Sequence, residues 1–217
     1  MISPGWTKIC GVTQPEDLEM VIAAGADAVG LNLWPGSPRC ISYESAKELV
    51  GLARGRIATV GVCVNLPESQ LLALRSDVGL DWVQLHGDEP AHLVSRLGDR
   101  AFKALGIAGE ADVTSALSMP GSLVLVDARD DIARGGTGQL APTSLARRIA
   151  AERATVLAGG LGPHNVAERI AAIRPMGVDT ASGVEISPGI KDPAKVQAFC
   201  LRAREAFLKI EDGVKDV

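Results

Sequence analysis

Aromatic side chains are scarce in this chain of 217 residues, because Phe, Trp and Tyr together make up 3% of it. Single-stranded nucleic acids are usually bound on aromatic stacking platforms, so this composition argues against such a partner. A basic surplus is also missing, since 22 Lys and Arg face 26 Asp and Glu for a net charge of −4. We therefore expect no nucleic-acid partner, and an anionic ligand would have to be held by local groups.

Cysteine and histidine are few and scattered. The four cysteines (Cys10, Cys40, Cys63, Cys200) form no C-x-x-C pair, and the three histidines have no matching carboxylate set, so we expect no metal site. No apolar run reaches the length of a membrane span, and the N-terminus lacks the basic flank and apolar core of a signal peptide. These absences predict a cytoplasmic protein with free thiols and no membrane partner.

Short apolar runs alternate with longer amphipathic segments along the chain. Hydrophobic residues make up 47% of it, mostly Ala, Val, Leu and Ile, which suit strands buried on both faces. The expected strands are Thr7–Cys10, Asp27–Leu31, Ala58–Val64, Trp82–Leu85, Phe102–Leu105, Leu123–Asp127, Thr155–Ala158 and Val178–Thr180. The expected helices are Pro15–Ala24, Tyr43–Ala53, Pro67–Arg75, Glu89–Leu97, Glu110–Ser118, Thr143–Ala151, Pro163–Ile173 and Pro193–Phe207.

Strict alternation of strand and helix predicts a parallel sheet with right-handed crossovers. Eight such units in so short a chain favour one (β/α)8 barrel domain over residues 1–217, and an open doubly wound sheet is the alternative. Thr13 and Glu16 have the spacing of a capping box at a helix start. The last segment, Glu211–Val217, is expected to be a frayed tail.

Glycine clusters follow the last three expected strands, at Gly135–Gly138, Gly159–Leu161, and Ser182–Glu185 with Ser187–Gly189. In (β/α)8 barrels a phosphate commonly lies at the late loops, where glycine lets main-chain N–H groups approach an anion. Turns between strands and helices need glycine anyway, so a single cluster is weak evidence. Three successive clusters predict a phosphate site, whose candidate residues are Gly136, Gly138, Gly159, Gly160, Ser182 and Gly183.

Reactive side chains end two of the expected strands. Cys10 closes the first strand, where a thiol near positive charge can serve as a base or a nucleophile, and a small buried hydrophobe is the alternative. Asp127 ends the sixth strand, where partial burial would raise its pKa as a general acid requires, and a cap for the next turn is the alternative. Their opposite placement on the ring suits a base and an acid that flank one substrate.

Two polar residues at other strand ends are further candidates. Arg39, after the second strand, is able to fork onto a carboxylate, although a solvated loop arginine is the commoner case. His86 ends the fourth strand, where it either hydrogen-bonds a substrate or acts as a structural donor.

Together these residues resemble the phosphoribosylanthranilate isomerase family. The matching stretches run in the family's order over nearly the whole chain and are Lys8–Thr13, Gly25–Asp27, Ser37–Arg39, Val83–Gly87, Asp127–Ala128, Gly135–Gly138, Ala158–Leu161, Ser182–Glu185 and Pro188–Asp192. The resemblance implies a cofactor-independent Amadori rearrangement of N-(5-phosphoribosyl)anthranilate to 1-(2-carboxyphenylamino)-1-deoxyribulose 5-phosphate in tryptophan biosynthesis.

By that resemblance Asp127 is the general acid that protonates the ring oxygen, and Cys10 is the general base that takes the C2′ proton. Arg39 would hold the anthranilate carboxylate, and the glycine loops would hold the phosphate. Substrate binding is further assigned to three residues of the matching stretches, Lys8, Gln84 and His86. The expected partner is thus a small phosphorylated substrate, bound by a monomer, with a homodimer left open.

Three stretches depart from the family's usual pattern. Leu31–Trp34 lacks the phenylalanines common before Ser-Pro-Arg, Gln139–Pro142 replaces an aromatic-Asp-Trp stretch, and Ala181 stands where a second serine is common. The acid, the base and the arginine are unaffected. The departures therefore bear on loop shape, affinity and turnover more than on the reaction.

Three alternatives to this function are considered. A histidine-pathway or dual-specificity phosphoribosyl isomerase runs the same chemistry but usually has an aspartate as the base on the first strand, where this chain has Cys10. A sugar-phosphate epimerase would need metal ligands that the sequence does not offer. The non-enzymatic alternative is a phosphate-ligand sensor on a decayed barrel, although sensing needs neither Cys10 nor Asp127.

Overall fold

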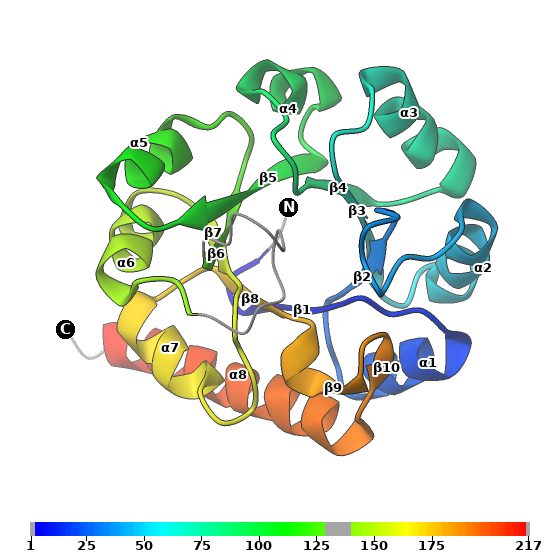
Figure 1. Ribbon diagram of the computed structural model, residues 1–217. Coiled ribbons are helices and arrows are strands. Elements are labelled where there is room, and N and C mark those ends of the chain that lie inside the picture. The colour runs from blue at the N-terminus through cyan, green and yellow to red at the C-terminus, as the bar shows by residue number, and fades with distance from the viewer. Residues whose placement is uncertain (1–2, 129–139, 216–217) are drawn as a thin grey trace.

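The computed structural model describes residues 3–128 and 140–215. Parallel strands β1 to β8 close into a barrel in chain order, with β1 hydrogen-bonded to β8, and helices surround it (Figure 1). This closure confirms the predicted (β/α)8 barrel and excludes the open sheet. The strands are β1 (Trp6–Cys10), β2 (Ala28–Asn32), β3 (Ala58–Cys63), β4 (Trp82–Leu85), β5 (Ala101–Ile107), β6 (Val124–Ala128), β7 (Thr155–Leu157) and β8 (Gly177–Thr180).

A helix follows each barrel strand, and short elements are inserted after β3 and β8. The α-helices are α1 (Pro15–Ala23), α2 (Tyr43–Ala53), α3 (Glu68–Ala73), α4 (Ala91–Leu97), α5 (Glu110–Ser118), α6 (Thr143–Glu152), α7 (Val166–Ile173) and α8 (Pro193–Lys215). The insertions are the π-helical turn η1 (Leu74–Val78), the 3-10 turn η2 (Ser182–Val184) and the antiparallel hairpin β9 (Glu185–Ser187) and β10 (Ile190–Lys191). In the described part of the chain, no helix combines the length and apolarity that crossing a membrane requires.

Two hydrophobic cores follow from the pleat of the strands. Successive side chains of a strand point to opposite faces, so one set fills the barrel and the other packs under the helices. In β6, Leu125 belongs to the cluster inside the barrel, whereas Val124 and Val126 belong to the outer cluster. In β2, Ala28 faces inward and Val29 faces the helices in the same way.

Several details of the helices and turns differ from the sequence expectations. Thr13 does not cap α1, because its hydroxyl donates to the carbonyl of Gly189 at 2.7 Å, and α1 begins after Gln14 with Pro15 in its first turn. Helix α7 begins at Val166 rather than Pro163, because the Asn165 side chain bonds Gly162 N and Gly160 O and holds a turn there.

Two further differences lie toward the C-terminus. Helix α8 continues to Lys215, past the end expected at Phe207 and through most of the segment expected to fray. The Ser187–Gly189 cluster, grouped with the phosphate loops, instead forms the turn of the β9–β10 hairpin, with Gly189 at φ +85°. That turn is absent from the lining of the cavity described below.

Candidate active site

The alternation of side chains along the strands also places the candidate site residues. Trp6 belongs to the cluster inside the barrel, so Lys8 and Cys10, two and four residues later in β1, face inward as well. Leu125 lies inside the barrel, and Asp127, two residues later in β6, therefore faces inward as well. Both reactive side chains therefore project from the carboxyl ends of their strands, where barrel sites are built.

The same alternation of inward and outward side chains applies to β4 and β8. Trp82 packs against the inner cluster, which puts Gln84 and then His86 on the inner side. In β8, Val178 packs outward, so Asp179 points inward. Asp179 was not among the candidate residues predicted from the sequence, although it follows an apolar residue near a strand end, the same signal that indicated Asp127.

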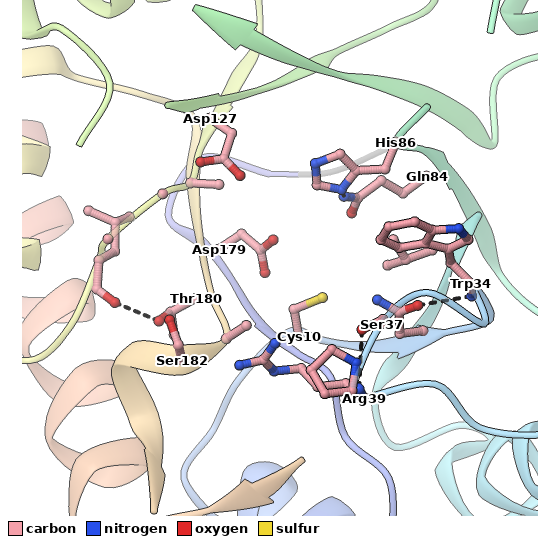
Figure 2. Close-up of a pocket in the computed structure, with 18 of the residues that line it drawn as sticks. Cys10, Trp34, Ser37, Arg39, Gln84, His86, Asp127, Asp179, Thr180 and Ser182 are labelled. Atoms are coloured by element: carbon pink, nitrogen blue, oxygen red, sulfur yellow. Dashed lines mark hydrogen bonds between the residues drawn. The ribbon is translucent and has the colours of Figure 1, made fainter. Parts of the chain in front are cut away.

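These side chains meet in a cavity of about 370 Å³ at the mouth of the barrel (Figure 2). Figure 2 shows Cys10, Asp127 and Asp179 pointing into it from three different strands. Its lining includes Cys10, Asn32, Trp34, Ser37, Arg39, Gln84, His86, Asp127, Gly159, Gly160, Asp179, Thr180 and Ser182. The structure thus brings together most of the residues that the sequence singled out.

Four candidate residues are not part of this lining. Lys8 is fully buried beneath the cavity. Gly183 is not in the lining, and it packs so closely on the carbonyl of Leu161 that a side chain has no room. Gly136 and Gly138 lie outside the described residues.

Lys8 and Asp179 form a buried ion pair below the cavity. The Lys8 Nζ lies 2.9 Å from Asp179 Oδ2, and the two side chains are 0% and 8% exposed. Burial alone would lower the pKa of Lys8, but the Asp179 carboxylate outweighs it and the net pKa is raised. Burial raises the pKa of Asp179, against the opposing charge of Lys8. Lys8 therefore acts on the site through its charge, and direct substrate binding by Lys8 does not fit its burial.

The thiol of Cys10 lies in a tight space with charges around it. Burial raises its pKa, and the positive charge of Lys8 opposes that shift. Gly30 is its register partner in β2, and a Cβ there would lie 2.7 Å from Cys10 Sγ. The missing side chain at position 30 therefore makes the space that the thiol occupies.

Arg39 lines the cavity but is not the solvated loop arginine of the simpler interpretation. Its Nε and Nη2 donate to the two carboxylate oxygens of Glu185, at 2.8 and 2.7 Å. This bidentate bond raises the pKa of Arg39 and keeps it charged. One edge of the guanidinium is thus already used, and a ligand carboxylate would meet the Nη1 side.

Glu185 has a second cationic partner, Lys191. The Lys191 Nζ lies 2.7 Å from Glu185 Oε1 and also donates to the main-chain carbonyl of Cys10 at 2.5 Å. Burial would raise the pKa of Glu185, but the bond from Arg39 and the charge of Lys191 outweigh it, so the net pKa is lowered. Burial lowers the pKa of Lys191, against the charge of Glu185.

Gln84 and His86 form the polar wall of the cavity on the β4 side. The Gln84 Nε2 and His86 Nδ1 atoms are 3.0 Å apart. Gln84 is 1% exposed, and its Oε1 is buried with no hydrogen-bond partner among the described residues. A buried amide oxygen of this kind is satisfied by a donor from a ligand or a water.

The late loops form the opposite side of the cavity. Gly159 and Gly160 have φ of +80° and +59°, a conformation that glycine adopts without strain. The hydroxyl of Thr180 donates to the carbonyl of Leu161 at 2.6 Å and ties the loop after β7 to the end of β8. The loops after β7 and β8 therefore form one rigid glycine-rich surface, next to the exposed Ser182.

The remaining thiols are apart from this site. Burial raises the pKa of Cys63 to about 12 and that of Cys200 to about 11, as expected for structural cysteines. Residues 3–128 and 140–215 contain no group of three or more His, Cys, Asp and Glu side chains suited to a metal ion. The fold and the site define the class: a (β/α)8 barrel with an acid and a thiol facing one cavity at its mouth.

Comparison with known proteins narrows this class. The family model of N-(5′-phosphoribosyl)anthranilate (PRA) isomerase matches residues 7–202. The N-(5′-phosphoribosyl)anthranilate isomerase of Pelobacter propionicus is 38% identical over 198 residues, covering 91% of this chain and 95% of the relative. The crystal structure of phosphoribosyl anthranilate isomerase from Thermotoga maritima superposes with a TM-score of 0.84 at 36% identity, covering 92% of this chain and 98% of that one.

A further solved structure is of phosphoribosyl anthranilate isomerase in complex with reduced 1-(o-carboxyphenylamino)-1-deoxyribulose 5-phosphate. It superposes with a TM-score of 0.81 at 36% identity, covering 92% of this chain and 98% of that chain. The chain belongs to the phosphoribosylanthranilate isomerase family, and it is accordingly an isomerase of tryptophan biosynthesis.

Proposed function

We propose that the chain rearranges N-(5′-phosphoribosyl)anthranilate to 1-(2-carboxyphenylamino)-1-deoxyribulose 5-phosphate without a cofactor, with Asp127 as general acid and Cys10 as general base. The observation that supports this most is that both side chains face one cavity from different strands. The family relationship to proteins that carry this substrate in their name supports the choice of substrate.

The first step opens the sugar ring. Asp127 gives its proton to the ring oxygen as the C1′–O bond breaks, and the anthranilate nitrogen lone pair forms an iminium with C1′. Asp127 is 7% exposed, and the main-chain N–H of Ala128 donates to its Oδ1 at 2.7 Å, which fixes the orientation of the carboxyl group. The raised pKa expected for this acid stays a prediction.

The second step moves a proton from carbon. The iminium acidifies C2′, and the Cys10 thiolate takes its proton to leave an enolamine. The enolamine becomes the ketone as its C2′ hydroxyl loses a proton and C1′ gains one. Lys8 favours the thiolate because its positive charge opposes the effect of burial on the pKa of Cys10.

The two ends of the substrate need different anchors. The Nη1 side of Arg39 would hold the anthranilate carboxylate, with Trp34 lining the same cavity as an apolar surface for the ring. Trp34 thus stands in for the phenylalanines that the family usually has in this region. Main-chain N–H groups of Gly159 and Gly160, the Ser182 hydroxyl and the loop around Gly183 would hold the phosphate, and Gln84 and His86 would contact the sugar.

A direct assay tests this function. Purified protein is mixed with phosphoribosylanthranilate, and the loss of anthranilate fluorescence is followed with the next enzyme of the pathway as a coupling step. Growth rescue of a tryptophan auxotroph, beside a histidine auxotroph, then reports the breadth of the substrate. Rescue of the tryptophan strain alone is expected; rescue of the histidine strain would require the dual-specificity alternative, and no turnover would favour the sensor. A cytoplasmic, monomeric enzyme remains part of the proposal.

A further inference from the structure

Arg39 and Cys10 come from different elements, yet one pair of buried ions connects them. Glu185 of β9 holds Arg39 through both carboxylate oxygens. Lys191 of β10 bonds Glu185 and donates to the main-chain carbonyl of Cys10. The hairpin thus joins the loop after β2 to the end of β1, two segments that the barrel strands alone would not fix relative to each other above the sheet.

Both members of this pair are removed from solvent. The side chains of Lys191 and Glu185 are 0% and 4% exposed. A buried ion pair seldom stabilises a fold more than apolar residues of the same size would, because desolvation offsets the attraction. Its position between two site residues therefore points to a role other than stability.

The hairpin itself is held in place by bonds to α1 and its preceding loop. The main-chain N–H of Lys191 donates to Asp17 Oδ2 at 3.0 Å, and Thr13 bonds the carbonyl of Gly189. Asp17 is 2% exposed. The hairpin that carries the ion pair is therefore bonded to α1 and its preceding loop on one side, and to Arg39 and Cys10 on the other. Such contacts on both sides are what a rigid support requires.

We propose that Glu185 and Lys191 are positioning residues that hold the guanidinium of Arg39 and the main chain of Cys10 in a fixed relation at the cavity. This inference rests on the proposed function, in which Arg39 anchors the substrate carboxylate and Cys10 removes the proton. Neither Glu185 nor Lys191 lines the cavity, so both act through the groups they hold.

Glu185 determines which side of the guanidinium a ligand meets. Because Nε and Nη2 are bonded to Glu185, the orientation of the Arg39 guanidinium plane is fixed before the substrate binds. A preset anchor lowers the entropy cost of binding, so its loss should raise KM more than it lowers kcat.

Lys191 affects Cys10 by charge as well as by its bond to the carbonyl. The charged groups that face the thiol are Lys8 on its own strand, Asp179 on β8, Lys191 on β10 and Arg39 after β2, with Asp127 and His86 on the same cavity. Lys191 is one of the positive charges that oppose the effect of burial on the pKa of Cys10. Its removal should therefore raise that pKa further.

The test compares Glu185→Gln, Lys191→Met and the double variant with the parent protein. Glu185→Gln leaves Lys191 buried without its carboxylate partner, and Lys191→Met leaves Glu185 bonded to Arg39 alone, so each single variant should lose stability. The double variant removes both buried ions and should unfold close to the parent's midpoint in urea. Glu19→Gln is the matched control, because Glu19 also holds an arginine, Arg56, through both oxygens, at 2.6 and 2.7 Å, on the exposed surface.

Two readouts separate positioning from stability. In the double variant, KM for phosphoribosylanthranilate should rise about tenfold while kcat falls less. The pH midpoint of Cys10 alkylation by iodoacetamide, located by peptide mass spectrometry, should move upward. Glu19→Gln should change neither. Parent-like KM and alkylation midpoint in a stable double variant would overturn the proposal.

The alkylation readout needs no substrate, so it reports on the network even if the proposed function fails. If the double variant does not fold, Glu185→Asp replaces it, since that change keeps the charge and shortens the side chain by one methylene. It should raise KM and leave the alkylation midpoint at the parent's value. An unchanged KM in Glu185→Asp would then contradict the role of Glu185.

Discussion

Lys8 and Asp179 are register partners across the seam where β1 meets β8, and their side chains form the ion pair beneath the cavity. The seam that closes the barrel thus also sets the charge environment of Cys10, two residues farther along β1. A positive group below the thiol opposes the effect of burial on its pKa, and a negative group beside it adds to that effect.

Replacing Lys8 by methionine should destabilise the fold strongly. Lys8→Met leaves Asp179 buried without its partner, which costs about 3 kcal/mol in free energy of unfolding. Urea denaturation measures the loss. Glu68→Gln, which breaks the exposed ion pair with Arg96, should cost less than about 1 kcal/mol. Equal losses of unfolding free energy in the two variants would contradict the importance assigned to the buried pair between β1 and β8.

The activity should rise with pH above neutrality. Because burial raises the pKa of Cys10, the protonated thiol dominates at neutral pH, and the thiolate fraction grows as pH approaches the raised pKa. A profile of kcat/KM against pH should therefore show an ascending limb on the alkaline side. A profile already flat from neutral pH upward would mean that a different base removes the proton.

Gly30→Ala should impair catalysis without unfolding the protein. The new Cβ would lie 2.7 Å from Cys10 Sγ and 3.1 Å from Cε of Lys8, so the thiol has to move. We expect kcat to fall by about tenfold or more, because small misplacements of a reacting group are costly. Gly51→Ala in α2 is the control, since nothing lies within 4 Å of its added Cβ, and it should keep the parent's kcat. A parent-like kcat in Gly30→Ala would show that the thiol position is not critical.

Elements with a clear period were predictable from the sequence. The bounds expected for Trp82–Leu85 and Glu110–Ser118 are those of β4 and α5. The predicted start of α7 at Pro163 was wrong, because the hydrogen bond from Gly162 N to the Asn165 side chain holds a turn there and the helix begins only at Val166. Local preferences thus determine the elements, whereas specific side-chain hydrogen bonds adjust their ends.

Cys10, His86 and Asp127 were predictable as cavity residues because they end strands, and strand ends meet at the mouth of a barrel. Asp179, which also lies near a strand end, was missed. The partners of the cavity residues were not predictable. Arg39 and Glu185 are 146 positions apart, and no pattern in the sequence pairs two loops at that separation. The use of one edge of Arg39 by Glu185, and the burial of Lys8 under the thiol, follow only from the closed fold.

The central claim is that Asp127 and Cys10 transfer the two protons of one rearrangement. Kinetic analysis of Cys10→Ser and Asp127→Asn with phosphoribosylanthranilate tests it most directly. Each variant should lose about 10²-fold or more in kcat while the KM stays within a few-fold of the parent, because the anchors at both ends of the substrate remain. Near-normal turnover in either variant would contradict the role assigned to that residue.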